Sequence, residues 1–422
     1  MKAFKLLLRM TGILFCGIIL GFALLTAVYS LPLEPIAANV RASIPALNGE
    51  WGSEDSYHQL IKGYGTTQLD NSTDAAMLLA AAHESDLSAA QQAIRADTYN
   101  GSGNAFSVLM DYGAGKSLES ASIARYWHGY LVFLKPLLMV CSYLDIRMLL
   151  AVVQCLMLGL VIAGLCRRQL SRLVVPFLLS LLCITPSVTA FSMQFSTVLL
   201  TFLGAMLCLL YQPKLRANHL PVFFLLTGMF TSYIDYLTYP VAAFGMPFVL
   251  AVFLFPKQNA KEEILRFVML GIFWCAGYFG MWAGKWIITG FFGAEKWFWP
   301  NLIAKITQRS SSETGDIALS FGMVLKQLFS LFSKRAYLLI FLSAALVWLW
   351  KVIGSHRLPA KPILTGRSVV LVLCALIPFV WYFCTKNHSY NHAFFTSRAL
   401  CVSVFAMGAF LSGFIRRHED AK

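Results

Sequence analysis

The sequence has few charged residues, and acidic residues are the scarcest of them. Charged side chains make up 13% of the 422 residues, whereas a soluble domain carries about 25%. Apolar residues make up 58%. A water-soluble fold would expose much of this apolar surface at a cost of roughly 25 cal/mol per Å². The composition therefore excludes a soluble globular protein, a disordered chain and a disulfide scaffold, and it predicts an all-α polytopic membrane protein.

The cysteine and histidine spacings typical of metal-binding and redox sites are also missing. Ten cysteines are present, but no C-x-x-C or Cys/His metal spacing occurs, and no cysteine lies between Leu31 and Trp127. We interpret the cysteines as small apolar residues. The chain has 34 basic and 20 acidic residues, which gives a net charge of +14. In a membrane protein this excess fits basic cytoplasmic loops, so no nucleic-acid partner is expected.

Long apolar runs dominate the chain. A helix needs about 20 apolar residues to cross a bilayer. The sequence predicts about ten transmembrane helices, at roughly 7–30, 147–166, 173–190, 194–211, 219–236, 240–256, 267–289, 336–354, 368–385 and 399–415. The first run is too long for a cleavable signal peptide, whose apolar core has about 7–15 residues. We interpret it as an uncleaved anchor.

Basic residues fall in alternate connections between these spans. The clusters are Lys2, Lys5 and Arg9; Arg167, Arg168 and Arg172; Lys214 and Arg216; Lys257, Lys261 and Arg266; Lys351, Arg357, Lys361 and Arg367; and Arg416, Arg417 and Lys422. Cytoplasmic loops are enriched in Lys and Arg. The pattern predicts a multi-pass protein of a bacterial plasma membrane with both termini in the cytoplasm.

Polar material gathers on the opposite side of the predicted membrane. We expect an anchor over 1–30, an extracytoplasmic loop over 31–146, spans 2–7 over 147–289, a second extracytoplasmic loop over 290–335, and spans 8–10 with a cytoplasmic tail over 336–422. The run Tyr130–Tyr143 is apolar but short, and we expect an interfacial or re-entrant helix there. Apolar residues at helical spacing predict an amphipathic helix at Ile317–Ala336.

Two carboxylates four residues apart stand out in the first polar segment. Asp70 and Asp74 flank Asn71–Thr73, which predicts a helix cap before the apolar run Asp74–His83. The pair either favours the helix N-terminus or acts as a general base or metal-binding pair at the membrane surface. Glu54 and Asp55 form a weaker alternative pair.

Further ionisable residues belong to the same predicted face. His388 and His392 have a spacing that can bind a metal on a helix, and Arg398 can hold a phosphate through two parallel hydrogen bonds. An aromatic anchor, a solvated loop or a paired charge would explain each of these groups structurally. The candidate substrate-binding residues are Arg125, His128, Asp235, His388, Tyr390, His392 and Arg398. No metal ligand set is assigned, and the need for a divalent cation stays open.

This layout resembles the multispanning glycosyltransferases of the GT-C superfamily. The shared features are the long loop after the first span, the acidic Asp70/Asp74 motif, the interfacial stretch Trp127–Tyr143 and the basic turn around His388. The resemblance implies membrane lipids as partners and a polyprenyl-phosphate-linked sugar as the donor. It also implies that Asp70 or Asp74 deprotonates the acceptor hydroxyl, while Arg398, His388 and Arg125 hold the donor phosphate.

The resulting hypothesis is an integral membrane glycosyltransferase that modifies an extracytoplasmic glycan, lipid or protein of the cell envelope. One alternative is a lipid or solute transporter or flippase, which should show mid-membrane ionisable residues and an internal repeat. Few such residues and no repeat are seen in the sequence. A second alternative is a non-catalytic membrane component of envelope assembly.

Overall fold

The structure is a computed structural model that describes residues 2–51, 57–257, 259–293, 296–354 and 366–413. Several residues discussed from the sequence lie outside these ranges, namely Glu54, Asp55, Arg357, Lys361, Arg416, Arg417 and Lys422.

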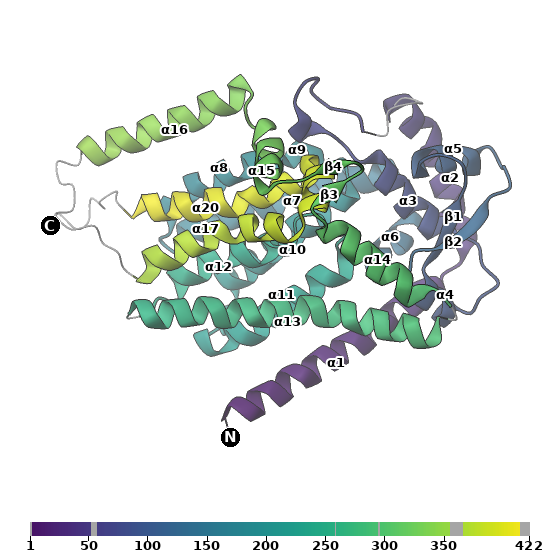
Figure 1. The fold of residues 1–422 in the computed structure, drawn as a ribbon, viewed down its shortest axis with the longest axis horizontal. Coiled ribbons are helices and arrows are strands. Elements are labelled where there is room, and N and C mark those ends of the chain that lie inside the picture. Colours follow the sequence, from purple (N-terminus) through teal and green to yellow (C-terminus); the bar gives the residue numbers. More distant parts are fainter. Residues whose placement is uncertain (1, 52–56, 258, 294–295, 355–365, 414–422) are drawn as a thin grey trace.

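Most of the described structure is helical, and its strands form only two small two-stranded sheets, as expected for an all-α fold (Figure 1). The bundle helices are α1 (Lys2–Tyr29), α7 (Tyr143–Arg167), α8 (Val174–Ile184), α10 (Met193–Tyr211), α11 (Leu220–Ile234), α12 (Ala242–Leu254), α13 (Ala260–Phe292), α16 (Arg335–Gly354), α17 (Gly366–Cys384) and α20 (Leu400–Ser412). Short elements join them: η2 (Ser171–Leu173), α9 (Pro186–Thr189), η3 (Ala217–His219), α14 (Phe298–Ser310), β3 (Glu313–Thr314), β4 (Ile317–Ala318), α15 (Phe321–Ser330), α18 (Lys386–Asn391), α19 (Ala393–Thr396) and η4 (Ser397–Ala399).

Seven of the described helices are long and apolar enough to cross a membrane. They are Phe4–Tyr29, Tyr143–Arg167, Met193–Tyr211, Ala260–Phe292, Arg335–Ile353, Gly366–Cys384 and Ala393–Ser412, the last of which runs through α19, η4 and α20. The other three predicted spans coincide with the shorter helices α8, α11 and α12, of 11, 15 and 13 residues. The run predicted at 173–190 breaks at Thr185, which has a φ of 54° and is followed by Pro186.

The polar segment after α1 folds into a unit that we call the cap. It contains α2 (Leu33–Trp51), η1 (Gly65–Thr67), α3 (Asn71–Ala82), α4 (Ala89–Arg95), β1 (Asp97–Asn100), α5 (Ala105–Gly113), β2 (Glu119–Ser122) and α6 (Leu131–Leu138). β1 and β2 pair antiparallel, with Asp97 opposite Ser122. Apolar residues of the cap share one buried core with α1, and α7 contributes its first turn. The cap therefore does not fold as a separate domain.

The Ala-rich helix α3 is central to the cap. Its N-cap is Asp70, which accepts hydrogen bonds from the amide (2.9 Å) and the hydroxyl (2.8 Å) of Thr73. The helix thus begins at Asn71, three residues earlier than Asp74, because Asp70 rather than Asn71–Thr73 supplies the cap. Small alanine side chains allow the helix to be surrounded by its neighbours.

Specific hydrogen bonds fix the cap to the bundle. Trp127 Nε1 donates to the carbonyl of Met281 at 2.7 Å, and the amide of Gly129 donates to the carbonyl of Tyr233 at 2.9 Å. Lys285, which is buried on α13, donates to the carbonyls of Ala93 and Ile94 at the end of α4. The loop that follows β2 is therefore fixed against α11 and α13.

Close contact between α11 and α13 depends on two glycines. A Cβ atom on Gly228 would overlap the carbonyl of Trp274, and one on Gly277 would overlap the carbonyl of Leu225. The two backbones can approach this closely only because glycine has no side chain. This contact sets the position of α13, which carries one wall of the candidate site.

Two segments were expected to form interfacial helices. Within Tyr130–Tyr143 the chain forms the eight-residue helix α6, whose Leu131, Leu134 and Lys135 are buried in the cap. Within Ile317–Ala336 it forms α15, which buries Val324 and Leu328.

Candidate functional site

The sequence-predicted site residues fall into two groups at the end of the bundle that carries the cap. The first group lies where α3 meets α10 and η4, and consists of Asp70, Asp74 and Arg398. The second lies around the loop after β2, the α11–α12 turn and α18, and consists of Arg125, His128, Asp235, His388, Tyr390 and His392.

Asp74 joins the cap to two bundle helices. Its side chain accepts hydrogen bonds from Tyr143 Oη (2.8 Å), Ser192 Oγ (3.1 Å) and the amide of Gln194 (3.2 Å). It is only 1% exposed. Burial raises the pKa of Asp74 to about 7, although the hydrogen bonds from Tyr143 and Gln194 lower it. The carboxyl group therefore has a clear structural role.

Asp70 and Arg398 are also buried. Burial raises the pKa of Asp70, while the bonds from Thr73 and the charge of Arg398 oppose the rise. Arg398 donates to the carbonyls of Ile184 (3.1 Å), Phe394 (2.5 Å) and Thr66 (3.4 Å). These three bonds tie η1 of the cap to the ends of α8 and α19, and they direct the guanidinium inward.

His128 belongs to a hydrogen-bonded aromatic cluster. Its Nε2 lies 2.8 Å from the carbonyl of Ile123, so this nitrogen carries the proton. Its Nδ1 then accepts from the hydroxyl of Tyr236 at 2.7 Å, and Tyr236 lies 3.1 Å from the hydroxyl of Tyr130. Burial lowers the pKa of His128 to about 3. The histidine is therefore neutral and orients the loop rather than binding an anion.

The α11–α12 turn is held from two sides. Asp235 accepts hydrogen bonds from the amide and hydroxyl of Thr238, the shortest at 2.6 Å. Leu237 has a φ of 64°, a conformation that is rare for residues other than glycine. His388 Nε2 lies 2.8 Å from the Leu237 carbonyl. The turn is thus held by Asp235 at its own start and by His388 from α18.

His392 packs beside this turn. Its imidazole stacks on Phe395 with ring centroids 5.1 Å apart, and it lies 5.0 Å from the ring of His388. Burial lowers the pKa of His392 to about 4 and also lowers the pKa of His388. Tyr390 is half-buried against the bundle core. Within the described residues, no group of three or more His, Cys, Asp or Glu is placed to hold a metal ion.

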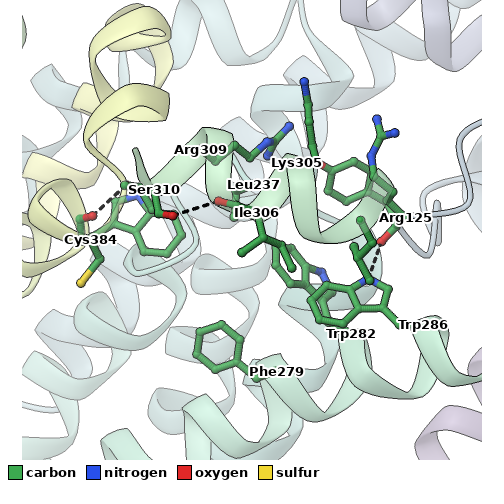
Figure 2. A pocket seen from close by; sticks show the side chains of 14 residues that line it. Arg125, Leu237, Phe279, Trp282, Trp286, Lys305, Ile306, Arg309, Ser310 and Cys384 are labelled. Carbon is green, nitrogen blue, oxygen red and sulfur yellow. Dashed lines mark hydrogen bonds between the residues drawn. The ribbon is translucent and has the colours of Figure 1, made fainter. Parts of the chain in front are cut away.

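A pocket of about 200 Å³ opens beside the loop that follows β2, which carries Arg125 and Tyr126 and which we call the cap loop. The other walls are the α11–α12 turn, α13, α14 and the end of α17 (Figure 2). Its lining residues are Arg125, Tyr126, Leu237, Phe279, Trp282, Trp286, Leu302, Lys305, Ile306, Arg309, Ser310, Trp381, Cys384 and Thr385. Of the sequence-predicted site residues, Arg125 alone lines this pocket.

One side of the pocket is aromatic. Phe279, Trp282 and Trp286 follow one another on one face of α13, and Figure 2 shows them on the side opposite the charged groups. The rings of Trp282 and Trp286 lie 5.4 Å apart. Trp286 Nε1 donates to the carbonyl of Arg125 at 3.0 Å, so the aromatic wall also supports the loop. Phe279 is 53% exposed, which leaves this wall open toward the outside of the bundle.

The other side of the pocket is cationic. Figure 2 shows the charged ends of Arg125, Lys305 and Arg309 along its upper edge. Lys305 and Arg309 lie one turn apart on α14. The Arg309 guanidinium lies 5.6 Å above the ring of Tyr126. A cationic edge above an aromatic wall is suited to an amphiphile with an anionic head group.

Lys305 and Arg309 were not among the residues predicted from the sequence. No sequence motif includes them, but their helical spacing could have indicated a cationic helix face. The segment 298–310 places these cations at i and i+4, and it places the apolar Leu302 and Ile306 at the same spacing on the neighbouring face. No protein-family model, curated protein or solved structure matches this chain.

Proposed function

We propose that this chain is an integral membrane glycosyltransferase that binds a polyprenyl-phosphate-linked sugar in the pocket beside α13. It would cross a bacterial plasma membrane ten times, with α8, α11 and α12 completing the bundle and the cap on the extracytoplasmic side. The observation that carries the proposal is the pairing of three cations with an aromatic wall in one pocket. It supports binding of an anionic amphiphile; sugar transfer comes from the GT-C resemblance.

The two walls suit the two parts of such a donor. Guanidinium and ammonium groups bind phosphate oxygens through charge-assisted hydrogen bonds. Indole and phenyl rings pack against isoprene units and against the apolar face of a sugar. Phe279 lies on a helix long enough to cross the membrane and is partly exposed. A lipid could therefore reach the aromatic wall directly from the bilayer.

We assign the general base to none of Asp70, Asp74 and Asp235. A base must lie within hydrogen-bond reach of the hydroxyl that it deprotonates. None of the three lines the pocket, and all three are engaged in structural hydrogen bonds.

Sugar transfer from radiolabelled polyprenyl-phosphate sugars to envelope acceptors tests the proposal. Membranes containing the wild-type protein should transfer label from such a donor. Arg309→Gln should raise the donor concentration needed for half-maximal rate. Lys296→Gln provides the matched control, because Lys296 is exposed and does not line the pocket.

Two results would contradict the proposal. One is the absence of transfer with every donor, combined with movement of a fluorescent polyprenyl phosphate across vesicle membranes, which would indicate a flippase. The other is an unchanged half-maximal donor concentration for the Arg309→Gln variant.

A further inference from the structure

The helix α14 has more apolar surface than the protein core covers. Phe298 and Leu302 lie on one side of it and are buried against the cap loop. Trp299, Ile303 and Ile306 lie on the neighbouring side and are 41%, 61% and 45% exposed. Their spacing places them on one face of the helix. Large apolar side chains gathered in this way indicate a surface that contacts something other than water.

The opposite side of α14 is polar. Asn301 and Gln308 are both exposed, and their spacing of two helical turns places them on one face. Lys296, just before the helix, is exposed as well. The outward surface of α14 is therefore divided into an apolar and a polar side. This division is typical of helices that lie in the plane of a membrane interface.

The exposed apolar side of α14 is continuous with an exposed apolar side of α13. On α13, Phe279 and Ile287 are each more than half exposed, and this helix is long and apolar enough to cross a membrane. Gly290 follows Ile287 by three residues and lies on the same side. Trp299 packs over Gly290 so closely that a Cβ atom on Gly290 would overlap the indole. The two apolar surfaces therefore meet at Trp299.

The contact with Gly290 sets the depth of α14. The span that the sequence predicts at 267–289 ends just before Gly290. Trp299 therefore lies at the boundary between hydrocarbon and head groups, where tryptophan is enriched in membrane proteins. Figure 1 shows that α14 does not continue away from the bundle but turns back from the end of α13 toward β3. The whole helix thus stays near this boundary.

We infer that α14 is an interfacial helix that binds the surface of the bilayer on the side of the cap. Trp299, Ile303 and Ile306 contact the acyl chains next to the head groups, while Asn301 and Gln308 face water. Lipid rather than a second protein covers the apolar side, because this side continues the exposed apolar surface of the membrane-crossing helix α13. The placement is independent of the chemistry carried out in the pocket and goes beyond the proposed function.

This placement also determines where the pocket opens. Ile306 lines the pocket and belongs to the exposed apolar side of α14. Because that side rests on the bilayer, the mouth of the pocket lies at the level of the head groups. An amphiphile in this leaflet reaches the pocket by lateral diffusion, without first leaving the membrane.

Fluorescence quenching in proteoliposomes of phosphatidylethanolamine and phosphatidylglycerol tests the inference. An environment-sensitive NBD label is attached to Ile303→Cys or Asn301→Cys of the full chain lacking native cysteines. Both positions are exposed, so neither change removes core packing. Nitroxides on the upper acyl chains should quench the label at 303 several-fold more than at 301, and aqueous iodide should show the reverse order. Phe279→Cys is the reference for lipid, and Lys116→Cys in the cap is the reference for water.

A second pair, Ile306→Cys and Gln308→Cys, should give the same contrast if one of the first variants fails to fold. Equal iodide quenching on both sides of α14, with little nitroxide quenching, would place the helix in water and overturn the inference. Equal nitroxide quenching on both sides would place the whole helix in the hydrocarbon and would also overturn it. Protection of position 303 from both quenchers would show that protein, such as a second copy of the chain, covers the apolar side instead of lipid.

Discussion

The hydroxyl of Tyr143 donates a 2.8 Å hydrogen bond to the carboxyl group of Asp74. The two residues are 69 positions apart in the sequence, and the bond joins α3 of the cap to the first turn of α7. Ser192 and the amide of Gln194 bind the same carboxyl group from the start of α10. One acid thus connects the cap to two helices, and its protonation affects how firmly the cap is held.

Stability should depend on pH through Asp74. Burial raises the pKa of Asp74 from the ordinary 3.8 to about 7, so the folded protein holds this proton more tightly than the unfolded chain does. The stabilisation from Asp74 is therefore complete below about pH 4 and is lost as the pH rises to about 7. Asp74→Asn, which is neutral at every pH, should remove this dependence from the melting temperature in detergent. Asp86→Asn, at an exposed position, should retain it. A constant difference between wild type and Asp74→Asn from pH 4 to 8 would contradict the assignment.

Arg398 should matter for stability rather than for lipid binding. Its guanidinium bonds to three carbonyls and lies 4.0 Å above the ring of Phe195. Arg398→Lys keeps the charge but cannot bond to all three carbonyls, and each lost charged hydrogen bond costs about 1.5–3 kcal/mol. We expect a lower melting temperature for Arg398→Lys and a larger drop for Arg398→Ala. Folded Arg398→Lys protein should still bind a short polyprenyl-phosphate analogue such as farnesyl phosphate. Weaker binding at an unchanged melting temperature would return Arg398 to the ligand site, as the sequence suggested.

The crossing of α11 and α13 should not tolerate a side chain. Gly277→Ala places a methyl group against the carbonyl of Leu225, and such overpacking costs typically about 1–3 kcal/mol. The variant should have a lower melting temperature and weaker ligand binding, because α13 carries the aromatic wall. Gly159→Ala is the control, since the space beside Gly159 is open. Equal melting temperatures for these two variants would contradict the close crossing.

Labelling of intact cells should establish the direction of insertion. A cysteine at Arg168 should be inaccessible to an impermeant maleimide from outside, whereas one at Lys116 in the cap should react. The background is a variant that lacks native cysteines. External labelling at position 168 would place Arg167 and Arg168 outside and would reverse the proposed topology.

The fold was more predictable than the site because apolar runs are a local signal. A run of about 20 apolar residues forms a helix largely independently of its neighbours, so α1, α7 and α13 lie near their predicted positions. Even the break in the third predicted span had a local cause, since Pro186 cannot donate the hydrogen bond that a continuous helix needs.

The site depends on contacts between distant segments, which a single sequence does not specify. Asp74 and Arg398 looked like members of one polar site, but the structure engages both in hydrogen bonds that hold the cap. Lys305 and Arg309 belong to no recognisable sequence motif. They join the candidate site only in the folded chain, because α14 packs beside α13 and the cap loop. This packing places Lys305, Arg309 and Arg125 around the same pocket.

The length of α13 has a consequence for how a lipid would bind. Its 33 residues rise about 50 Å, whereas the hydrocarbon core of a bilayer is about 30 Å thick. The aromatic wall runs along the second half of this helix, from Phe279 to Trp286. A polyprenyl chain packed there, as proposed, would lie parallel to α13 and would keep the orientation that it has in its own leaflet. Its head group would reach the cations while its tail stayed in the hydrocarbon, so binding would avoid the extraction cost of about 0.8 kcal/mol for each CH₂ group withdrawn into water.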